Sequence, residues 1–146
     1  MKVKIKVIKN TINLDKPGKR IRKKAITDGG SQLLQEIQRR ASGKRKPIRG
    51  VHPYRAGNES VKGAIINKQD GDFYNSLSGR LPKSPASLSR PYYYYVESEG
   101  VKYAPYLIEG TSVMYARDIF RDAVNDKDTR ENVYKAALQA AKKALK

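Results

Sequence analysis

The sequence contains no cysteine and no tryptophan, and His52 is its single histidine among 146 residues. Without cysteine the chain has no disulfide framework and no thiolate metal site. His52 has no second histidine or cysteine with which to build a catalytic triad or a metal site, and no glycine-rich phosphate loop is present. We therefore predict that the chain is not an enzyme and that it uses no catalytic residue, cofactor or metal ion.

Long hydrophobic runs are also lacking. No apolar segment approaches the roughly 18 residues that a membrane span requires. Residues 1–10 (MKVKIKVIKN) alternate lysine with valine or isoleucine, which differs from the continuous apolar stretch of a secretory signal. We expect a soluble, intracellularly made protein without a membrane partner.

Acidic residues are scarce in the first third of the chain. Residues 1–50 hold 16 Lys or Arg against 3 Asp or Glu, whereas the whole chain carries a net charge of +17. This asymmetry indicates a basic face near polyanions, with nucleic acid as the first candidate. Contacts to phosphates and docking to an acidic protein remain equally open. The candidate contact residues lie in two clusters: Lys19, Arg20, Arg22, Lys23, Lys24, Lys44, Arg45, Lys46 and Arg49.

Tyrosine supplies almost all of the aromatic residues, ten against two phenylalanines. A tyrosine ring is apolar but carries a polar hydroxyl, so tyrosines suit half-buried faces and interfaces. Only 38% of the residues are hydrophobic, which is little for so many charged residues. We expect association with other chains to supplement the core of the monomer.

The first half of the chain predicts one strand and one helix. Residues 2–8 alternate lysine with Val or Ile, which indicates a half-buried strand. Residues 15–27 begin with Pro-Gly and continue with the basic cluster, which predicts a turn and an exposed connection. Apolar side chains recur at helical spacing over residues 31–42, with Ser31 as the cap. Residues 43–72 are predicted to be a loop insertion that orders against a neighbour.

The second half predicts a hairpin and two helices. Residues 92–96 are aromatic and β-branched, residues 97–100 form a turn, and residues 101–108 form a return strand with Pro105 at an edge. A short helix over residues 116–124 turns Ile119, Phe120 and Ala123 inward. The last helix starts at Asp128, with Asp126 and Asp128 as candidate caps, and Val133, Ala137, Ala141 and Leu145 line one face.

Three sequence elements occur in a specific order in residues 74–146. They are Ser78-Gly79-Arg80-Leu81, residues 103–111 (YAPYLIEGT) and residues 116–124 (ARDIFRDAV). In this order they resemble the neck proteins of tailed bacteriophages, the head–tail joining or tail-completion proteins of long-tailed phages. The chain departs from the family pattern at Asp118, where proline is usual, and at Pro82, where a basic or polar residue is usual.

The resemblance implies a single α+β domain over residues 1–146. It would contain a small antiparallel sheet with a β-hairpin, packed against two to three helices that include a long C-terminal helix. Residues 1–50 would form the very basic strand, arm and helix, and residues 73–146 the family-like part. Such proteins assemble in the virion neck as homo-oligomeric rings, commonly sixfold. Their partners are the portal or connector and the tail-terminator or tail-tube proteins, around the channel for genomic DNA.

The same resemblance gives a candidate subunit interface, in which alternating charges at residues 117–122 would set the register between subunits. Its candidate residues are Tyr93, Tyr95, Tyr103, Pro105, Tyr106, Glu109, Arg117, Asp118, Arg121 and Asp122. Two alternatives stay open, a small nonspecific nucleic-acid-binding protein and a tail-terminator or tail-tube ring protein.

Overall fold

The computed structural model describes residues 5–7, 18–43, 66, 71–81, 94–112 and 116–146. Within these residues, three strands form one antiparallel sheet in the order β1-β3-β2: β1 (Ile5–Val7), β2 (Leu77–Arg80) and β3 (Tyr94–Ser98). The described helices are α1 (Lys19–Arg40), α2 (Asp72–Ser76), α3 (Ala104–Glu109), α4 (Ile119–Asn125) and α5 (Lys127–Ala144). The predicted α+β class with a long C-terminal helix is confirmed.

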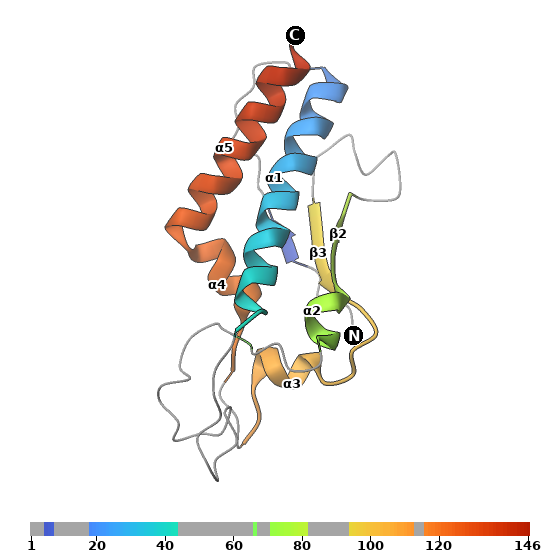
Figure 1. The fold of residues 1–146 in the computed structure, drawn as a ribbon, viewed down its shortest axis with the longest axis vertical. Helices are drawn as coiled ribbons and strands as arrows, with labels where there is room; N and C mark the ends of the chain where they lie inside the picture. The colour runs from blue at the N-terminus through green and yellow to red at the C-terminus, as the bar shows by residue number, and fades with distance from the viewer. Residues whose placement is uncertain (1–4, 8–17, 44–65, 67–70, 82–93, 113–115) are drawn as a thin grey trace.

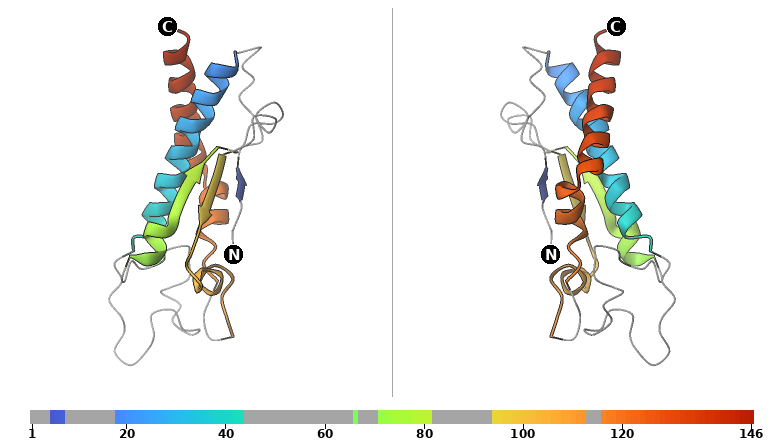
Figure 2. Two further views of the ribbon diagram at one scale, coloured as in Figure 1. Left: turned by 90° about the vertical axis from the view of Figure 1, so that its right-hand side faces the viewer. Right: turned by 90° about the vertical axis from the view of Figure 1, so that its left-hand side faces the viewer.

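The helices α1, α4 and α5 lie on the same side of the sheet (Figures 1 and 2). Helix α1 runs antiparallel to α5 and also contacts β2, β3 and α4, so it joins the sheet to the C-terminal helices. The outer parts of α1 and α5 extend beyond the described strands (Figure 2). We call these outer parts, residues 19–28 and 135–146, the arm.

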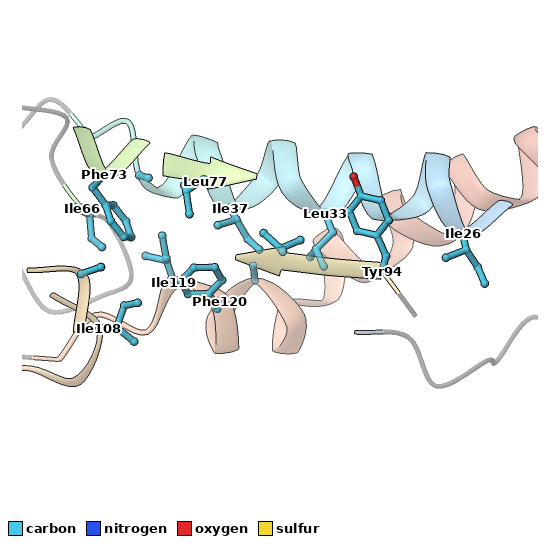
Figure 3. Packing of buried hydrophobic residues seen from close by; sticks show 14 residues of the cluster. Ile26, Leu33, Ile37, Ile66, Phe73, Leu77, Tyr94, Ile108, Ile119 and Phe120 are labelled. Carbon is cyan, nitrogen blue, oxygen red and sulfur yellow. The ribbon is translucent and has the colours of Figure 1, made fainter. Parts of the chain in front are cut away.

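The hydrophobic core lies between α1, α4 and the sheet (Figure 3). Leu33 and Ile37 of α1, Val96 of β3 and Phe120 of α4 belong to this one buried cluster. Among the helix residues, the predicted inward positions Ile119, Phe120 and Ala123 are fully buried. Burial of such side chains contributes about 1.5–3 kcal/mol each, so this layer holds the described elements together.

The ring of Tyr94 lies between two glycines that come from different elements. A Cβ atom added to Gly30 of α1 would overlap Cγ of Tyr94, and one added to Gly79 of β2 would lie 2.5 Å from Cε1 and Oη of the same ring. Tyr94 itself is 5% exposed. Glycine is therefore required at both positions by the space that the ring occupies, and the ring fixes the distance between α1 and the sheet.

Helix α1 begins twelve residues earlier than the sequence predicts, at Lys19 instead of residue 31. The hydroxyl of Ser31, the predicted cap, donates to Thr27 O at 2.8 Å inside the helix. Gly29 and Gly30 suggest a helix boundary by propensity, but they lie in the helix because Val133, Ala137 and Tyr94 pack closely against them. The exposed connection predicted for residues 15–27 is therefore wrong for residues 19–27, which are helical.

The hairpin predicted over residues 92–108 is also wrong. Strand β3 pairs with β1 through Ile5↔Val96 and with β2 through Gly79↔Val96, so it is the central strand. The return strand is replaced by α3, whose first turn contains Pro105. Proline lacks the backbone N–H that a strand donates to its neighbour. In the first turn of a helix the backbone N–H groups have no partner within the helix, so proline is tolerated there. The hairpin pairing of the fold is found between β2 and β3.

Asp side chains cap the two C-terminal helices. Asp118 Oδ1 accepts from the backbone N–H of Arg121 at 2.9 Å, and Asp126 Oδ2 accepts from the N–H of Thr129 at 2.9 Å. The last helix therefore begins at Lys127 with Asp126 as its cap, instead of at Asp128. Leu145, predicted on the buried face, is 68% exposed because the helix ends beside it.

Part of the predicted strand and loop lies outside the described residues. Of residues 2–8, the described residues 5–7 form β1 at one edge of the sheet. Of the predicted insertion 43–72, Ile66 is 1% exposed and is held at the end of α1, where its N–H donates to Arg40 O at 2.8 Å. Tyr93, Lys44, Arg45, Lys46 and Arg49 fall outside the described residues.

We expect Gly30→Ala to lower the free energy of unfolding by about 1–3 kcal/mol, because the new methyl group overlaps the Tyr94 ring. Helix propensity alone favours alanine by about 1 kcal/mol. In a Tyr94→Ala background the same change should therefore become stabilising. Urea unfolding followed by circular dichroism measures both values, and an equal effect in the two backgrounds contradicts the packing.

Asp126→Ala should lower Tm at neutral pH by more than Asp128→Ala. The Asp126 carboxylate accepts the N-cap hydrogen bond, whereas Asp128 is exposed. The hydrogen bond from the Thr129 hydroxyl lowers the pKa of Asp126 in the folded state, and the bond from the Thr129 N–H lowers it further. A lowered pKa gives stability that is fully present above the unfolded value of about 3.9 and is lost as the pH falls through the folded value. The Tm difference between wild type and Asp126→Ala should shrink over that acidic range, and a constant difference would count against the cap.

Candidate functional site

Helix α3 presents one exposed face to solvent. Tyr103, Tyr106 and Glu109 are spaced three residues apart and therefore share one side of the helix. Tyr103 is 44% exposed and Tyr106 58% exposed, and they belong to the few large apolar side chains that the described residues expose. We call Tyr103, Tyr106 and Glu109 the α3 face.

The opposite side of α3 is anchored in the main core. Ala104 and Ile108 are 4% and 6% exposed, and both belong to the same buried cluster as Ile119 of α4. Pro105 is half-buried beside them. Gly110 ends the helix with φ 78 and ψ −178, an extended conformation with positive φ that glycine adopts without strain. The α3 face is thus held outward by a short amphipathic helix with defined ends.

The segment before α4 holds α3 in place through its backbone. The N–H of Arg117 donates to Leu107 O at 3.0 Å and to Ile108 O at 3.1 Å, which satisfies carbonyls at the end of α3. Arg117 is 1% exposed, so its side chain is not available to a neighbouring subunit. This burial disfavours the predicted role of Arg117 in a charge pair between subunits, and its backbone N–H acts inside the monomer.

The remaining charges of that segment lie at the surface. Arg121 Nε lies 3.5 Å from Asp118 Oδ2 within the same helix turn, and the Arg121 side chain is 77% exposed. Asp122 is exposed as well. An exposed ion pair of this kind contributes little to stability. Asp118, Arg121 and Asp122 therefore remain accessible candidates for an interface.

The Gly-Arg-Leu element lies on β2 and is joined to β3 by an ion pair. Arg80 Nε donates to Glu97 Oε1 at 2.7 Å, and Arg80 Cζ lies 5.6 Å from the centre of the half-buried Tyr95 ring. This hydrogen bond to Glu97 raises the pKa of Arg80. Glu97 is 2% exposed, so the guanidinium compensates a buried carboxylate.

The three sequence elements therefore meet in one body. Leu77 precedes the first element on β2, Ile108 lies in the second and Ile119 in the third, and all three side chains belong to the same buried cluster. The Arg117 hydrogen bonds join the end of α3 to the segment that leads into α4. Tyr95 lies apart from them on the central strand.

The first basic cluster lies on the arm. Arg20, Lys23 and Lys24 are exposed, Arg22 is half-buried, and Lys19 is the first residue of α1, whose side chain is not described. The antiparallel pairing of α1 and α5 brings this cluster to the end of the arm, which also carries the exposed Lys142, Lys143 and Lys146. The sequence prediction gave these C-terminal lysines no role, because it started the first helix too late to reach them.

The described residues contain no group of three or more His, Asp or Glu side chains close enough to hold a metal ion. In the same part of the chain, no helix is both long and apolar enough to cross a membrane.

Comparison of the chain with protein-family models, curated proteins and solved structures finds no match.

Arg80→Met should lower Tm at neutral pH because it leaves the buried Glu97 carboxylate without its guanidinium. Protonation of Glu97 removes that unfavourable charge, so the Tm difference from wild type should narrow as the pH is lowered. Ser78→Ala, an exposed change on the same strand, is the control. Equal Tm values for the two variants would show that the ion pair does not stabilise the sheet.

Proposed function

We propose that this protein is a structural subunit of the tailed-phage neck, which acts by assembly and not by catalysis. It forms a homo-oligomeric ring between the portal or connector and the tail, around the DNA channel of the virion. The family resemblance covers residues 74–146, and it rests on the order of three sequence elements.

The observation that carries the proposal is the outward presentation of the α3 face. Tyr103 and Tyr106 are large, amphipathic and exposed, while the residues behind them are fixed by the core and by the Arg117 hydrogen bonds. Tyrosine anchors of this kind dominate the binding energy of many protein interfaces. A rigidly held anchor loses little conformational entropy on binding, which favours assembly.

The surroundings of the α3 face supply polar contacts for a subunit interface. Glu109 lies on the face itself, Lys102 is exposed at its start, and the exposed Arg121 and Asp122 follow on α4. Interfaces commonly surround their aromatic anchors with a polar rim that sets orientation. The face therefore offers both an apolar centre and charges of both signs.

We expect Tyr103→Ser/Tyr106→Ser to weaken ring formation at least about tenfold in the dissociation constant, since each anchor of this type contributes more than about 1 kcal/mol. Mass photometry and negative-stain microscopy of the purified chain over a range of concentrations measure the ring. The circular-dichroism spectrum should not change, because both side chains are exposed.

Tyr134→Ser is the matched control, because Tyr134 is 48% exposed but lies on α5, away from the α3 face. It should assemble as wild type does. A protein that stays monomeric at all concentrations, also when mixed with the connector of the phage whose genome encodes it, would refute the ring. A ring that forms equally well in the double variant would refute the role of the α3 face.

A further inference from the structure

We propose that the end of the arm binds the phosphate backbone of duplex nucleic acid, with cations from both the first turns of α1 and the last turns of α5. This surface is separate from the α3 face. Its binding does not require ring formation, so it extends beyond the neck assembly proposed above.

The end of the arm carries charge of one sign. Residues 19–27 contain five Lys or Arg and residues 132–146 contain four, while neither segment contains Asp or Glu. Arg20, Lys23, Lys135, Lys142, Lys143 and Lys146 are exposed. The nearest acid along α1 is Asp28, whose Oδ1 lies 3.5 Å from Nζ of Lys24.

The packing of α1 against α5 brings the basic residues at the start of α1 to the same height along the helix pair as the lysines at the end of α5. Gly29 lies against Val133 and Ala137, and Ala25 packs with Ala137 and Ala141. One further turn in this antiparallel register places Ile21 beside the last turn of α5, and Ile21 does pack against that alanine cluster. The basic residues of α1 and the C-terminal lysines therefore lie at the same end of the helix pair (Figure 1).

Helix stability accounts for Lys142 and Lys143, which lie in the last turn of α5 where the helix dipole favours cations, but it does not account for the cations of α1. The first turn of α1 contains no acidic residue although the positive end of the helix dipole favours acids there and disfavours cations. Lys19 and Lys23, and likewise Arg20 and Lys24, are four residues apart, a spacing at which like charges repel. Cations kept at positions that weaken the free helix indicate a partner that neutralises them.

The chemistry of the surface fits phosphates better than a protein or single-stranded nucleic acid. Within the described arm, Leu145 is the one large apolar side chain that is exposed, and protein interfaces depend on several buried anchors. Single strands are bound by stacking on aromatic rings, and residues 19–28 and 135–146 contain none. Long flexible cations without apolar anchors are the side chains that contact duplex phosphates.

The spacing of the lysines along α5 is compatible with the phosphate spacing of a DNA strand. Lys135 and Lys146 are eleven residues apart, which corresponds to about 16 Å along a helix. Phosphates of one DNA strand repeat every 3.4 Å or so, and the lysines therefore extend along about five of them. The binding should not depend on base sequence, since none of these side chains is held in a geometry that reads base edges.

The test is fluorescence anisotropy of a labelled duplex of about 30 base pairs with the full-length chain at several salt concentrations. Lys142→Gln/Lys143→Gln/Lys146→Gln should reduce affinity at least about tenfold at low salt. The slope of log K against log salt should become shallower by about 0.9 for each lost phosphate contact, up to about 2.7. Mass photometry of the same variant should show unchanged assembly, which separates this surface from the ring.

The matched control is Arg39→Gln/Lys127→Gln/Arg130→Gln, which removes the same charge from exposed positions away from both the arm and the α3 face. Its affinity should stay within about twofold of wild type, and Tm should confirm that both variants fold. Equal weakening by the two variants would reduce the effect to net charge and overturn the proposal. If poly-L-glutamate competes as effectively as unlabelled duplex DNA at equal charge, the partner is an acidic protein instead. Absence of duplex binding at low salt would also refute the proposal.

Discussion

The ring of Tyr94 sets the distance between the long N-terminal helix and the sheet, and most of the fold depends on that distance. The ring comes from the central strand, and it occupies the space that side chains at Gly30 and Gly79 would need. Helix α1 can then place Leu33 and Ile37 against Val96, and α4 can close the core with Phe120. Once α1 is seated in this way, its other side is free to carry α5. Gly30, Gly79 and the Tyr94 ring thus determine the position of α1, on which α5 packs.

The sequence predicted the inward face of α4 and the long last helix, because each depends on a local pattern of apolar residues, whereas the α+β class was implied by the resemblance. It failed where a contact distant in the chain overrides local preference. Gly29-Gly30 suggested a boundary, but these residues make room for Tyr94, Val133 and Ala137. Pro105 suggested a broken strand, although it serves equally well in the first turn of a helix.

The candidate site was predicted in part for the same reasons. Tyr103, Tyr106 and Glu109 are exposed, as an interface requires. They could be chosen from the sequence because they stand together in one short segment rich in tyrosine. Arg117 could not be placed from sequence, because an arginine beside an aspartate has the pattern of a surface charge whether or not it is buried. Its backbone bonds to Leu107 and Ile108 exist only in the folded chain. The C-terminal lysines join the basic cluster through helix pairing, which no local pattern encodes.

The contact between α1 and α5 at the arm is made mainly by alanines and Ile21, with far less apolar area than the layer around Phe120. Small side chains let the helix axes approach closely, but each buries little surface and so stabilises little. The cations on both helices repel one another across this thin contact, and that repulsion weakens as ionic strength rises. Local stability therefore declines from α4 toward the C-terminus, and amide protons of the last turns exchange before those beside the core. A polyanion that neutralises the arm would raise the local stability of the same turns.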